Sequence, residues 1–394
     1  MGMNDKPCRI SDVGVRLVRV PVNPPRGDAI QQFDALELPL VSISDASGNT
    51  GTGFGYTIGT GGTTIVELLK RELIYKLIGQ DSRRIEHIHN QLLASIHALT
   101  PGCISSAALA AIDVALWDLA GKRTNTPLYI LLGGAHDGVP VYNTHVGWLN
   151  RPLDEMVELC REAVHRDGFR ALKLKVGKSD PFEDVERVAA VRQAVGKNIS
   201  LMVDANQSWY KDEAIRRARL LEPYDLVWLE EPMPATDVEA HRVLGLHTSI
   251  PRAGGESLYS LAYFHAFIRN NGLDILQPDV VRIGGISNAL KVCHMAEAAG
   301  LRVAPHVSPE LSVTVAAAVK NSMFVEYIPQ MEPVLKNKVI IENGLARPFD
   351  KPGHGIEFNE DALNRLEVKN DQPGGGYAQL GERQRPEAPR GLQS

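Results

Sequence analysis

The chain has 394 residues, of which 44% are hydrophobic and 23% charged, so we expect a soluble globular protein of two domains or of one large barrel with an addition. The formal net charge of -5, without any cluster rich in lysine and arginine, excludes a general nucleic-acid binder. An anionic substrate therefore needs a local binding site rather than a global positive field.

The cysteines and the apolar stretches give the expected compartment. Four widely separated cysteines form no CxxC pair, which indicates reduced thiols in a cytosolic protein: Cys8, Cys103, Cys160 and Cys293. The first residues lack the apolar core of a signal peptide. The longest apolar helical stretch, residues 104–120, is interrupted by Asp113 and Asp118 and does not suit a membrane span. We therefore predict a cytoplasmic protein without a membrane anchor.

The first third of the chain is predicted to be α+β. Strand-like runs occupy residues 15–20 and 40–43, and a Gly-rich turn at 51–56 leads into a further strand. Residues 24–33 between the first two runs are polar and rich in turn residues, which predicts a mobile loop. Such a loop either covers a site or forms a surface connection, and the sequence alone favours the second. Three helical segments follow, at 65–78, 85–98 and 105–122.

From residue 139 onward, short apolar β-type runs alternate with segments of helix length. The predicted strands are 141–144, 171–176, 201–203, 226–229, 252–255, 275–280, 302–304 and 324–328. Repeated βα units of this length predict a parallel sheet, and eight strands predict a closed α/β barrel. A doubly wound open sheet is the alternative, but no Gly-x-Gly-x-x-Gly opens a βαβ unit. The tail from Asn370 has Pro, Gly and charge without apolar periodicity, which predicts a disordered or loosely draped segment at 370–394.

Two lysines lie on one face of a predicted strand. Residues alternate sides along a strand, so Lys173 and Lys175 point the same way while the leucines between and before them point the other way. Two neighbouring ammonium groups repel each other, which predicts a lowered pKa for one of them and a lysine that accepts a proton near neutral pH.

Further ionisable residues follow the other predicted strands at their carboxyl ends, where barrel active sites lie. They are Asp204, Glu230, Glu256, Asp279, His306 and Glu326. Each one alone is better explained as a helix cap, a surface ion pair or a structural histidine, but their joint occurrence on one rim favours a functional site. Three carboxylates from consecutive strands suit a hard divalent cation such as Mg2+.

The arrangement predicts a specific chemistry. Lysine on one side and His306 on the other would face each other across the metal, with Asp279 placed to orient the imidazole. Such a site suits removal of a proton next to a carboxylate, because a metal on the carboxylate oxygens stabilises the enediolate that forms.

The same residues carry a resemblance to the mandelate racemase subgroup of the enolase superfamily, which covers nearly the whole chain from about Ile10 to Leu366. The motifs are Lys173-Leu-Lys175, Val203-Asp-Ala-Asn206, Glu230-Glu-Pro232, Gly255-Glu256, Pro278-Asp279 followed by Arg282-Ile-Gly-Gly285, and His306.

The resemblance implies an α/β fold, a modified (β/α)7β TIM barrel at residues 136–329, with an N-terminal α+β capping domain at 1–135 that residues 330–368 complete. It implies Mg2+ as cofactor and homo-oligomers as the assembly, and the charge and apolar pattern given above predict no nucleic-acid or membrane partner. The resemblance implies that Asp204, Glu230 and Glu256 bind the metal. It implies that Lys175 and His306 are the acid/base groups, assisted by Lys173 and Asp279. The implied substrate contacts are Glu326, Asn206 and His145. Glu231 is interpreted as structural.

Two reactions fit these residues. A racemase or epimerase would exchange the proton on opposite faces, whereas an acid sugar dehydratase would also expel the β-hydroxyl to give a 2-keto-3-deoxy acid. The polar residues Arg26, Asp28, Gln31 and Gln32 suit a polyhydroxy substrate, and residues 142–148 resemble galactarate and talarate dehydratases. We therefore expect a dehydratase of a sugar mono- or diacid, with racemase or epimerase as the alternative. A non-catalytic barrel that only binds or has a structural role is disfavoured, because every expected metal-ligand and base position still holds a residue that can perform that role.

Overall fold

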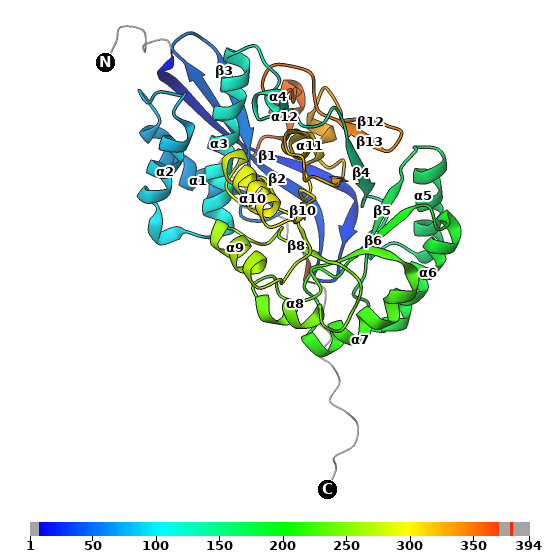
Figure 1. Ribbon diagram of the computed structural model, residues 1–394. Helices are drawn as coiled ribbons and strands as arrows, with labels where there is room; N and C mark the ends of the chain where they lie inside the picture. Colours follow the sequence, from blue (N-terminus) through cyan, green and yellow to red (C-terminus); the bar gives the residue numbers. More distant parts are fainter. Residues whose placement is uncertain (1–7, 370–378, 381–394) are drawn as a thin grey trace.

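The computed structural model describes residues 8–369 and the backbone of Gln379–Leu380. An antiparallel sheet with helices precedes a barrel of alternating strands and helices (Figure 1). The prediction for the tail concerns residues that lie outside the described part, apart from Gln379–Leu380, whose backbone (β14) pairs with β2 at Gln31 and Gln32.

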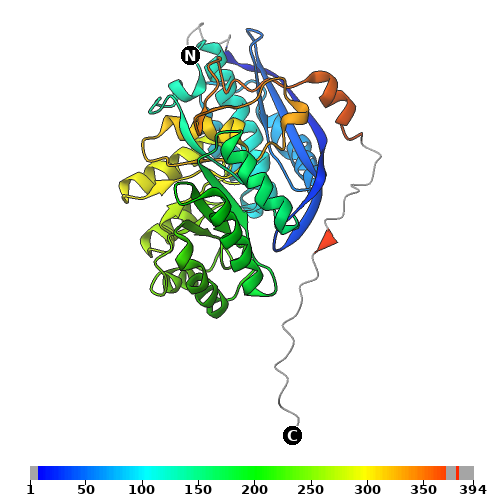
Figure 2. The same cartoon turned by 90° about the vertical axis from the view of Figure 1, so that its right-hand side faces the viewer.

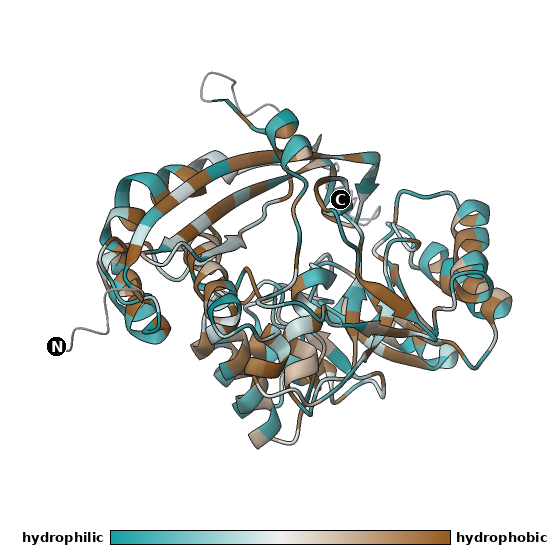
Figure 3. Ribbon diagram, turned by 90° about the horizontal axis from the view of Figure 1, so that it is seen from above, coloured by the Kyte–Doolittle hydropathy of each residue, from teal (hydrophilic) through white to brown (hydrophobic). Residues whose placement is uncertain are grey.

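The capping sheet consists of strands that are much longer than the sequence indicates. They are β1 (Ile10–Gly27), β2 (Gln31–Asp45) and β3 (Thr50–Phe54), all antiparallel. The long strands alternate hydrophobic and hydrophilic residues along their length (Figure 3). The prediction of a loop at residues 24–33 is wrong. Only Asp28–Ile30 form a turn, because β1 and β2 pair again at Arg26↔Phe33 and Gly27↔Gln32 after an irregularity in their register. Cross-strand pairing thus overrides the local turn composition.

Helices cover one face of this sheet. The segments are α1 (Gly62–Leu68), continued by η2 (Leu69–Leu73) and η3 (Ile74–Lys76), then α2 (Ile85–Ser95), η4 (His97–Leu99), α3 (Cys103–Arg123) and α4 (Leu128–Leu131). Helix α3 packs closely on β3, where a Cβ at Gly51 would lie 2.1 Å from the Ala115 carbonyl oxygen and one at Gly53 2.2 Å from that of Ala111. Glycine is therefore required at both positions for this packing.

Helix α3 is long and apolar enough to cross a membrane by length and composition, yet 78% of its most apolar window is buried inside the fold. It is a core helix of the capping domain, since its small residues pack against β2 and β3.

The barrel follows the predicted order. Its parallel strands are β4 (Val139–Asn143), β5 (Ala171–Lys175), β6 (Ser200–Asp204), β7 (Leu226–Glu230), β8 (Arg252–Gly254), β9 (Ile275–Leu276), β10 (Arg302–Val303) and β11 (Val325–Tyr327). Strand β11 pairs with β4, and a parallel bridge joins Val303 of β10 to Ser322, which lies just before β11. This is the predicted (β/α)7β barrel with an N-terminal capping domain, while the domain boundary near residue 135 stays a prediction.

Helices form the outer layer of the barrel. They are α5 (Leu153–His165), α6 (Pro181–Val195), α7 (Lys211–Leu221) with η5 (Glu222–Tyr224), α8 (Val238–Leu244), α9 (Leu261–Arg269), α10 (Ile286–Ala298) and α11 (Pro309–Ala318). Inside, a layer of buried side chains closes the barrel, with the rings of Tyr142 and Trp228 in T-shaped contact at 5.2 Å between centroids. Functional side chains therefore lie on a packed floor rather than over a pore.

After β11 the chain returns to the cap. The segments are η6 (Glu332–Val334), the hairpin β12 (Ile340–Glu342) and β13 (Leu345–Arg347), which pairs with β4, and α12 (Glu360–Leu366). Helix α12, orange-red in Figure 2, lies against β1, where Arg16 binds Glu360 at 2.9 Å and Glu367 at 3.1 Å. This contact agrees with the expected return, while the assignment of residues 330–368 to the capping domain stays a prediction.

Candidate active site

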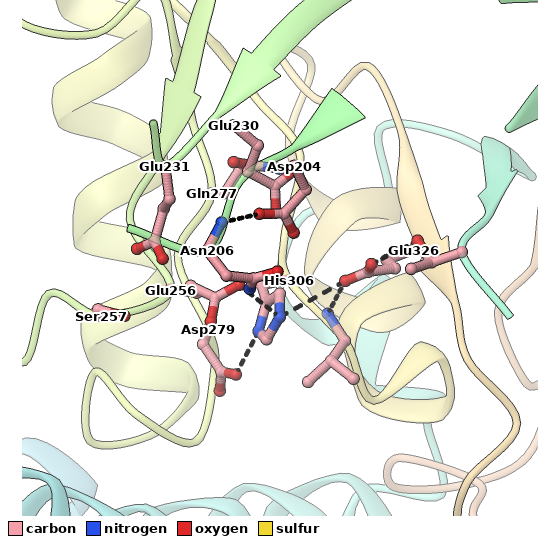
Figure 4. A network of polar contacts seen from close by, with 12 residues as sticks. Asp204, Asn206, Glu230, Glu231, Glu256, Ser257, Gln277, Asp279, His306 and Glu326 are labelled. Carbon is pink, nitrogen blue, oxygen red and sulfur yellow. Dashed lines mark hydrogen bonds and ion pairs between the residues drawn. The ribbon is translucent and has the colours of Figure 1, made fainter. Parts of the chain in front are cut away.

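Three buried carboxylates lie together at the carboxyl ends of consecutive barrel strands (Figure 4). Asp204 ends β6, Glu230 ends β7 and Glu256 follows β8, and one oxygen from each lies within 4.8 Å of the others. The parallel register makes Asp204 and Glu230 direct neighbours. Burial and the charge of Asp204 raise the pKa of Glu230 to about 7. Closely spaced carboxylates repel one another, and an all-oxygen donor set of this kind fits Mg2+, so the residues present suit the predicted metal.

The two lysines of β5 share one face of the strand, as predicted. Both are buried, and Leu174 between them packs on the opposite face in a separate apolar cluster. Lys175 Nζ lies 2.6 Å from Asp204 Oδ2, and Lys173 Nζ lies 2.6 Å from Glu230 Oε1. The predicted near-neutral lysine pKa is wrong for this arrangement. Burial lowers the pKa of Lys175, but the charge of Asp204 outweighs it and leaves that pKa above its ordinary value.

His306 occupies the opposite end of the carboxylate cluster. Its Nδ1 lies 2.8 Å from Asp279 Oδ2, and its Nε2 lies 2.9 Å from Glu256 Oε2. Burial lowers the pKa of His306, but Glu256 and the hydrogen bond with Asp279 raise it to about 10. The imidazole is therefore fixed in orientation at both nitrogens.

A strained turn follows His306. Val307 and Ser308 both have φ of 44°, a conformation that costs energy for a β-branched residue such as valine. The turn points the Val307 N–H at Glu326 Oε2, at 3.0 Å. The buried Glu326 also lies close to the histidine, with Glu326 Oε2 3.6 Å from His306 Nε2.

A cavity of about 470 Å³ opens above this cluster. Of the predicted catalytic and metal residues, Lys175, Glu256 and His306 line it, while Lys173, Asp204, Glu230 and Asp279 lie behind the wall. Asn206 also lines it, and its buried Oδ1 has no hydrogen-bond partner among the described residues. An acceptor of this kind is available to a hydroxyl group.

Two predicted substrate contacts do not reach the wall. Glu326 is completely buried, binds Lys173 at 2.9 Å and accepts a 2.6 Å hydrogen bond from Thr144 Oγ1. His145 is half-buried and is not among the residues that line the cavity. Burial, followed by the charges of Arg26 and Arg151, lowers the pKa of His145 to about 4.

The hairpin turn between β1 and β2 forms part of the cavity wall, contrary to the surface connection that the sequence favours. Asp28 and Gln31 line the cavity together with the apolar Ile30 and Phe33. The other two polar residues expected there do not line it: Gln32 is exposed, and Arg26 is buried and donates to Gln330 Oε1 at 3.2 Å.

Sequence reasoning gave no role to several residues of the wall. Tyr56 donates a hydrogen bond to Asp279, and Arg282 Nη1 lies 3.0 Å from Glu256 Oε1. Glu231, interpreted as structural, lines the cavity and accepts a 2.9 Å hydrogen bond from Gln207 Nε2. The sequence gives weak signals for two of these residues, since Arg282 lies in a motif of the resemblance and Gln207 follows Asn206. No sequence pattern distinguishes Tyr56 within its Gly-rich run.

Comparisons with known proteins match most of the chain. The family model "Mandelate racemase / muconate lactonizing enzyme, N-terminal domain" matches residues 11–133, and "Enolase C-terminal domain-like" matches residues 155–362. The chain is 36% identical over 333 residues to 3,6-anhydro-alpha-L-galactonate cycloisomerase of Streptomyces coelicolor, covering 84% of this chain and 92% of that protein.

It is also 35% identical over 363 residues to the L-talarate/galactarate dehydratase of Salmonella typhimurium, covering 90% of each chain. The crystal structure of that dehydratase with Mg and L-lyxarohydroxamate superimposes with a TM-score of 0.89 at 32% identity, covering 94% of this chain and 95% of that one.

Proposed function

Because the chain belongs to the mandelate racemase/muconate lactonizing enzyme family of the enolase superfamily, and is thus a lyase or an isomerase, we propose that it is a Mg2+-dependent acid sugar dehydratase. Its substrate would be a sugar mono- or diacid and its product the 2-keto-3-deoxy acid. The homo-oligomer and cytoplasmic location expected from the sequence are part of the same proposal.

One observation carries the proposal: a proton-transfer group contacts each end of the carboxylate cluster. Lys175 contacts Asp204, whereas His306 contacts Glu256, and both line the cavity. A substrate lying over the cluster would therefore meet one of these groups on each side. Lysine and histidine are suitable general acids and bases when positioned within hydrogen-bond distance of the reacting atom.

The donor atoms of Asp204, Glu230 and Glu256 would hold the metal. When bound there, Mg2+ supplies positive charge where negative charge develops on the substrate carboxylate. Lys173 and Glu326 lie behind the wall and would keep the charges of the cluster in place through their 2.9 Å ion pair.

The chain's own residues would divide the reaction between them. The carboxylate charges that raise the pKa values of Lys175 and His306 would be offset by a cation held by Asp204 and Glu256, so that one of these two residues could lose its own proton and take the proton from the α-carbon. The other donates a proton to the β-hydroxyl, so that the bond from carbon to oxygen breaks and water leaves. The resulting enol takes up a proton at the β-carbon and becomes the 2-keto-3-deoxy acid. Asp279, which contacts His306 Nδ1, would hold the imidazole with Nε2 directed at the substrate.

The cavity wall supports a polyhydroxy substrate. Asn206 Oδ1 and Glu231 Oε1 are buried acceptors without partners among the described residues, and Gln31 adds an amide. Buried acceptors are costly unless donors reach them, and sugar hydroxyl groups are donors. The Salmonella typhimurium relative, whose name specifies talarate and galactarate, acts on substrates of this class.

Proton NMR in D2O tests the proposal directly. Purified protein with Mg2+ is incubated with a panel of sugar mono- and diacids, and new methylene signals of a 3-deoxy product are the expected result. Loss of the α-proton signal without new methylene signals would instead establish a racemase or epimerase. Absence of both changes across the panel would contradict the proposal.

A further inference from the structure

The oxygen of Asp279 that faces His306 is shared with a tyrosine of the capping domain. Asp279 Oδ2 lies 2.8 Å from His306 Nδ1 and also accepts a hydrogen bond from the Tyr56 hydroxyl. The other carboxylate oxygen, Oδ1, accepts the backbone N–H groups of Val281 at 2.9 Å and Arg282 at 3.0 Å. Arg282 Nε also lies 3.8 Å from Oδ2, and among these contacts Tyr56 provides the one that comes from outside the barrel.

Tyr56 is fixed by the capping sheet. It lies between Gly55, whose N–H donates to the Pro39 carbonyl at 2.8 Å, and Thr57, which pairs with Glu37 through both backbone groups at 2.9 and 3.0 Å. The tyrosine is only 3% exposed, and the Arg282 guanidinium lies over its ring at 5.4 Å. The position of its hydroxyl is therefore set by the capping domain and not by the barrel strand that carries His306.

The hydroxyl acts as a donor in this contact. Burial raises the pKa of Tyr56 well above 10, and the nearby charge of Arg282 lowers it less, so the hydroxyl keeps its proton at neutral pH. A protonated phenol beside a carboxylate donates a charge-assisted hydrogen bond, which is stronger than one between neutral groups.

We propose that Tyr56 is a positioning residue that acts on His306 through Asp279. Without its hydroxyl, Asp279 Oδ2 would keep the contact with His306 Nδ1 and a longer ion pair with Arg282 Nε at 3.8 Å, and the carboxylate would be held less firmly against turning about the two backbone N–H groups that contact Oδ1. The imidazole would then lose its fixed orientation, so that proton transfer by His306 requires a docked capping domain. The inference rests on the proposed function for its kinetic consequence but not for its structural one.

The variant Tyr56→Phe keeps the ring and removes only the donor. Its matched control is Tyr327→Phe, since Tyr327 also donates to a carboxylate, that of Glu332 at 3.3 Å, and does not line the cavity. Loss of a hydrogen bond to a charged group corresponds to roughly a 10- to 100-fold change in an equilibrium or rate constant. The kcat of Tyr56→Phe should therefore fall by roughly that factor, with KM little changed. Tyr327→Phe should retain the wild-type kcat.

A double-mutant cycle separates positioning from a general structural effect. In an Asp279→Asn background, adding Tyr56→Phe should change kcat by less than about 3-fold, because the two residues act through one contact. Additive losses, or a Tyr56→Phe enzyme as active as Tyr327→Phe, would overturn the proposal. Tyr56→Met, which also lacks a donor, replaces Tyr56→Phe in the cycle if the phenylalanine variant does not fold.

A second readout is independent of activity. In protein labelled with 15N-histidine and loaded with Mg2+, the Nδ1–H signal of His306, assigned with His306→Asn, should shift in Tyr56→Phe and stay in place in Tyr327→Phe. An unshifted signal in Tyr56→Phe would overturn the inference. If the wild-type chain turned over no acid of the panel, the proposed function would fail while this signal still decided the role of Tyr56.

Discussion

Lys173 Nζ lies 2.6 Å from Glu230 Oε1, and both side chains are completely buried. The same ammonium group lies 2.9 Å from Glu326 and 3.3 Å from Asp204, so one cation serves three carboxylates behind the cavity wall. These ion pairs neutralise part of the negative charge behind the cavity wall. Removing the Lys173 ammonium group would leave buried carboxylates without a positive partner.

We therefore expect Lys173→Met to lower the free energy of unfolding by about 3–5 kcal/mol when Mg2+ is chelated, the usual cost of breaking a buried ion pair. Mg2+ should restore part of this loss, because a cation that binds only the folded chain stabilises it. Chemical denaturation with EDTA and with Mg2+ measures both effects. Lys351→Met is the control, since its pair with Glu357 is exposed, and equal stability of the two variants in EDTA would disprove the expectation.

A second prediction concerns the contact between cap and barrel. Asp113 of α3 accepts hydrogen bonds from the Ser287 hydroxyl at 2.6 Å and from its backbone N–H at 3.0 Å, at the start of barrel helix α10. Asp113→Ala would leave these donors unpaired in a buried place, at a cost of about 1–3 kcal/mol. Thermal unfolding should show a lower midpoint for this variant.

The matched control for Asp113→Ala is Glu86→Ala. Glu86 also joins a capping helix to α10, through a 2.6 Å pair with Lys291, but that pair is largely exposed. Exposed pairs contribute little, so the midpoint of Glu86→Ala should stay near that of the wild type. Equal losses in the two variants would mean that burial is not what makes the Asp113 contact strong.

The third prediction concerns stability in acid. Burial holds the pKa of His145 at about 4 in the folded chain, below its ordinary value of 6.5. The unfolded chain therefore binds a proton first as pH falls, so this contribution to stability is complete above pH 6.5 and is lost progressively toward pH 4. The loss amounts to as much as about 3 kcal/mol.

His145→Gln should remove this part of the pH dependence. Denaturant unfolding at several values between pH 4 and 6.5 should give a shallower slope for the variant than for the wild type. An exposed histidine supplies the control, and His247→Gln should leave the slope unchanged. A wild-type slope in His145→Gln would show that the folded chain already protonates His145 in this range.

The grouping of the proposed catalytic and metal-binding residues could be predicted from sequence, because the fold brings the carboxyl ends of the strands to one rim. Asp204 and Glu230 end neighbouring strands of a parallel sheet, so their side chains are brought together by register alone. Lys173 and Lys175 share a face for the same local reason. These relationships need only strand periodicity and strand order, both of which the hydrophobic pattern contains.

The cavity wall could not be predicted in this way, because it depends on contacts between the two domains. Tyr56 and Asp279 are 223 residues apart, and only the docking of the cap brings them together. The turn at Asp28 has the composition of a surface connection, yet the long pairing of β1 with β2 carries it to the site. The pKa of Lys175 was predicted with the wrong sign, since the sequence shows its neighbour Lys173 but not the distance to Asp204.

The most direct test of the proposed two-base site is proton NMR in D2O with Mg2+ and an acid that the wild type turns over, applied to Lys175→Ala and His306→Asn. Lys197→Ala, a change at an exposed position, is the control. The dehydration rate of each site variant should fall by roughly 100-fold or more, the usual contribution of a general acid or base. The variant that retains the base for the α-proton should still exchange that proton with solvent. Dehydration by both variants at the rate of Lys197→Ala would contradict the account.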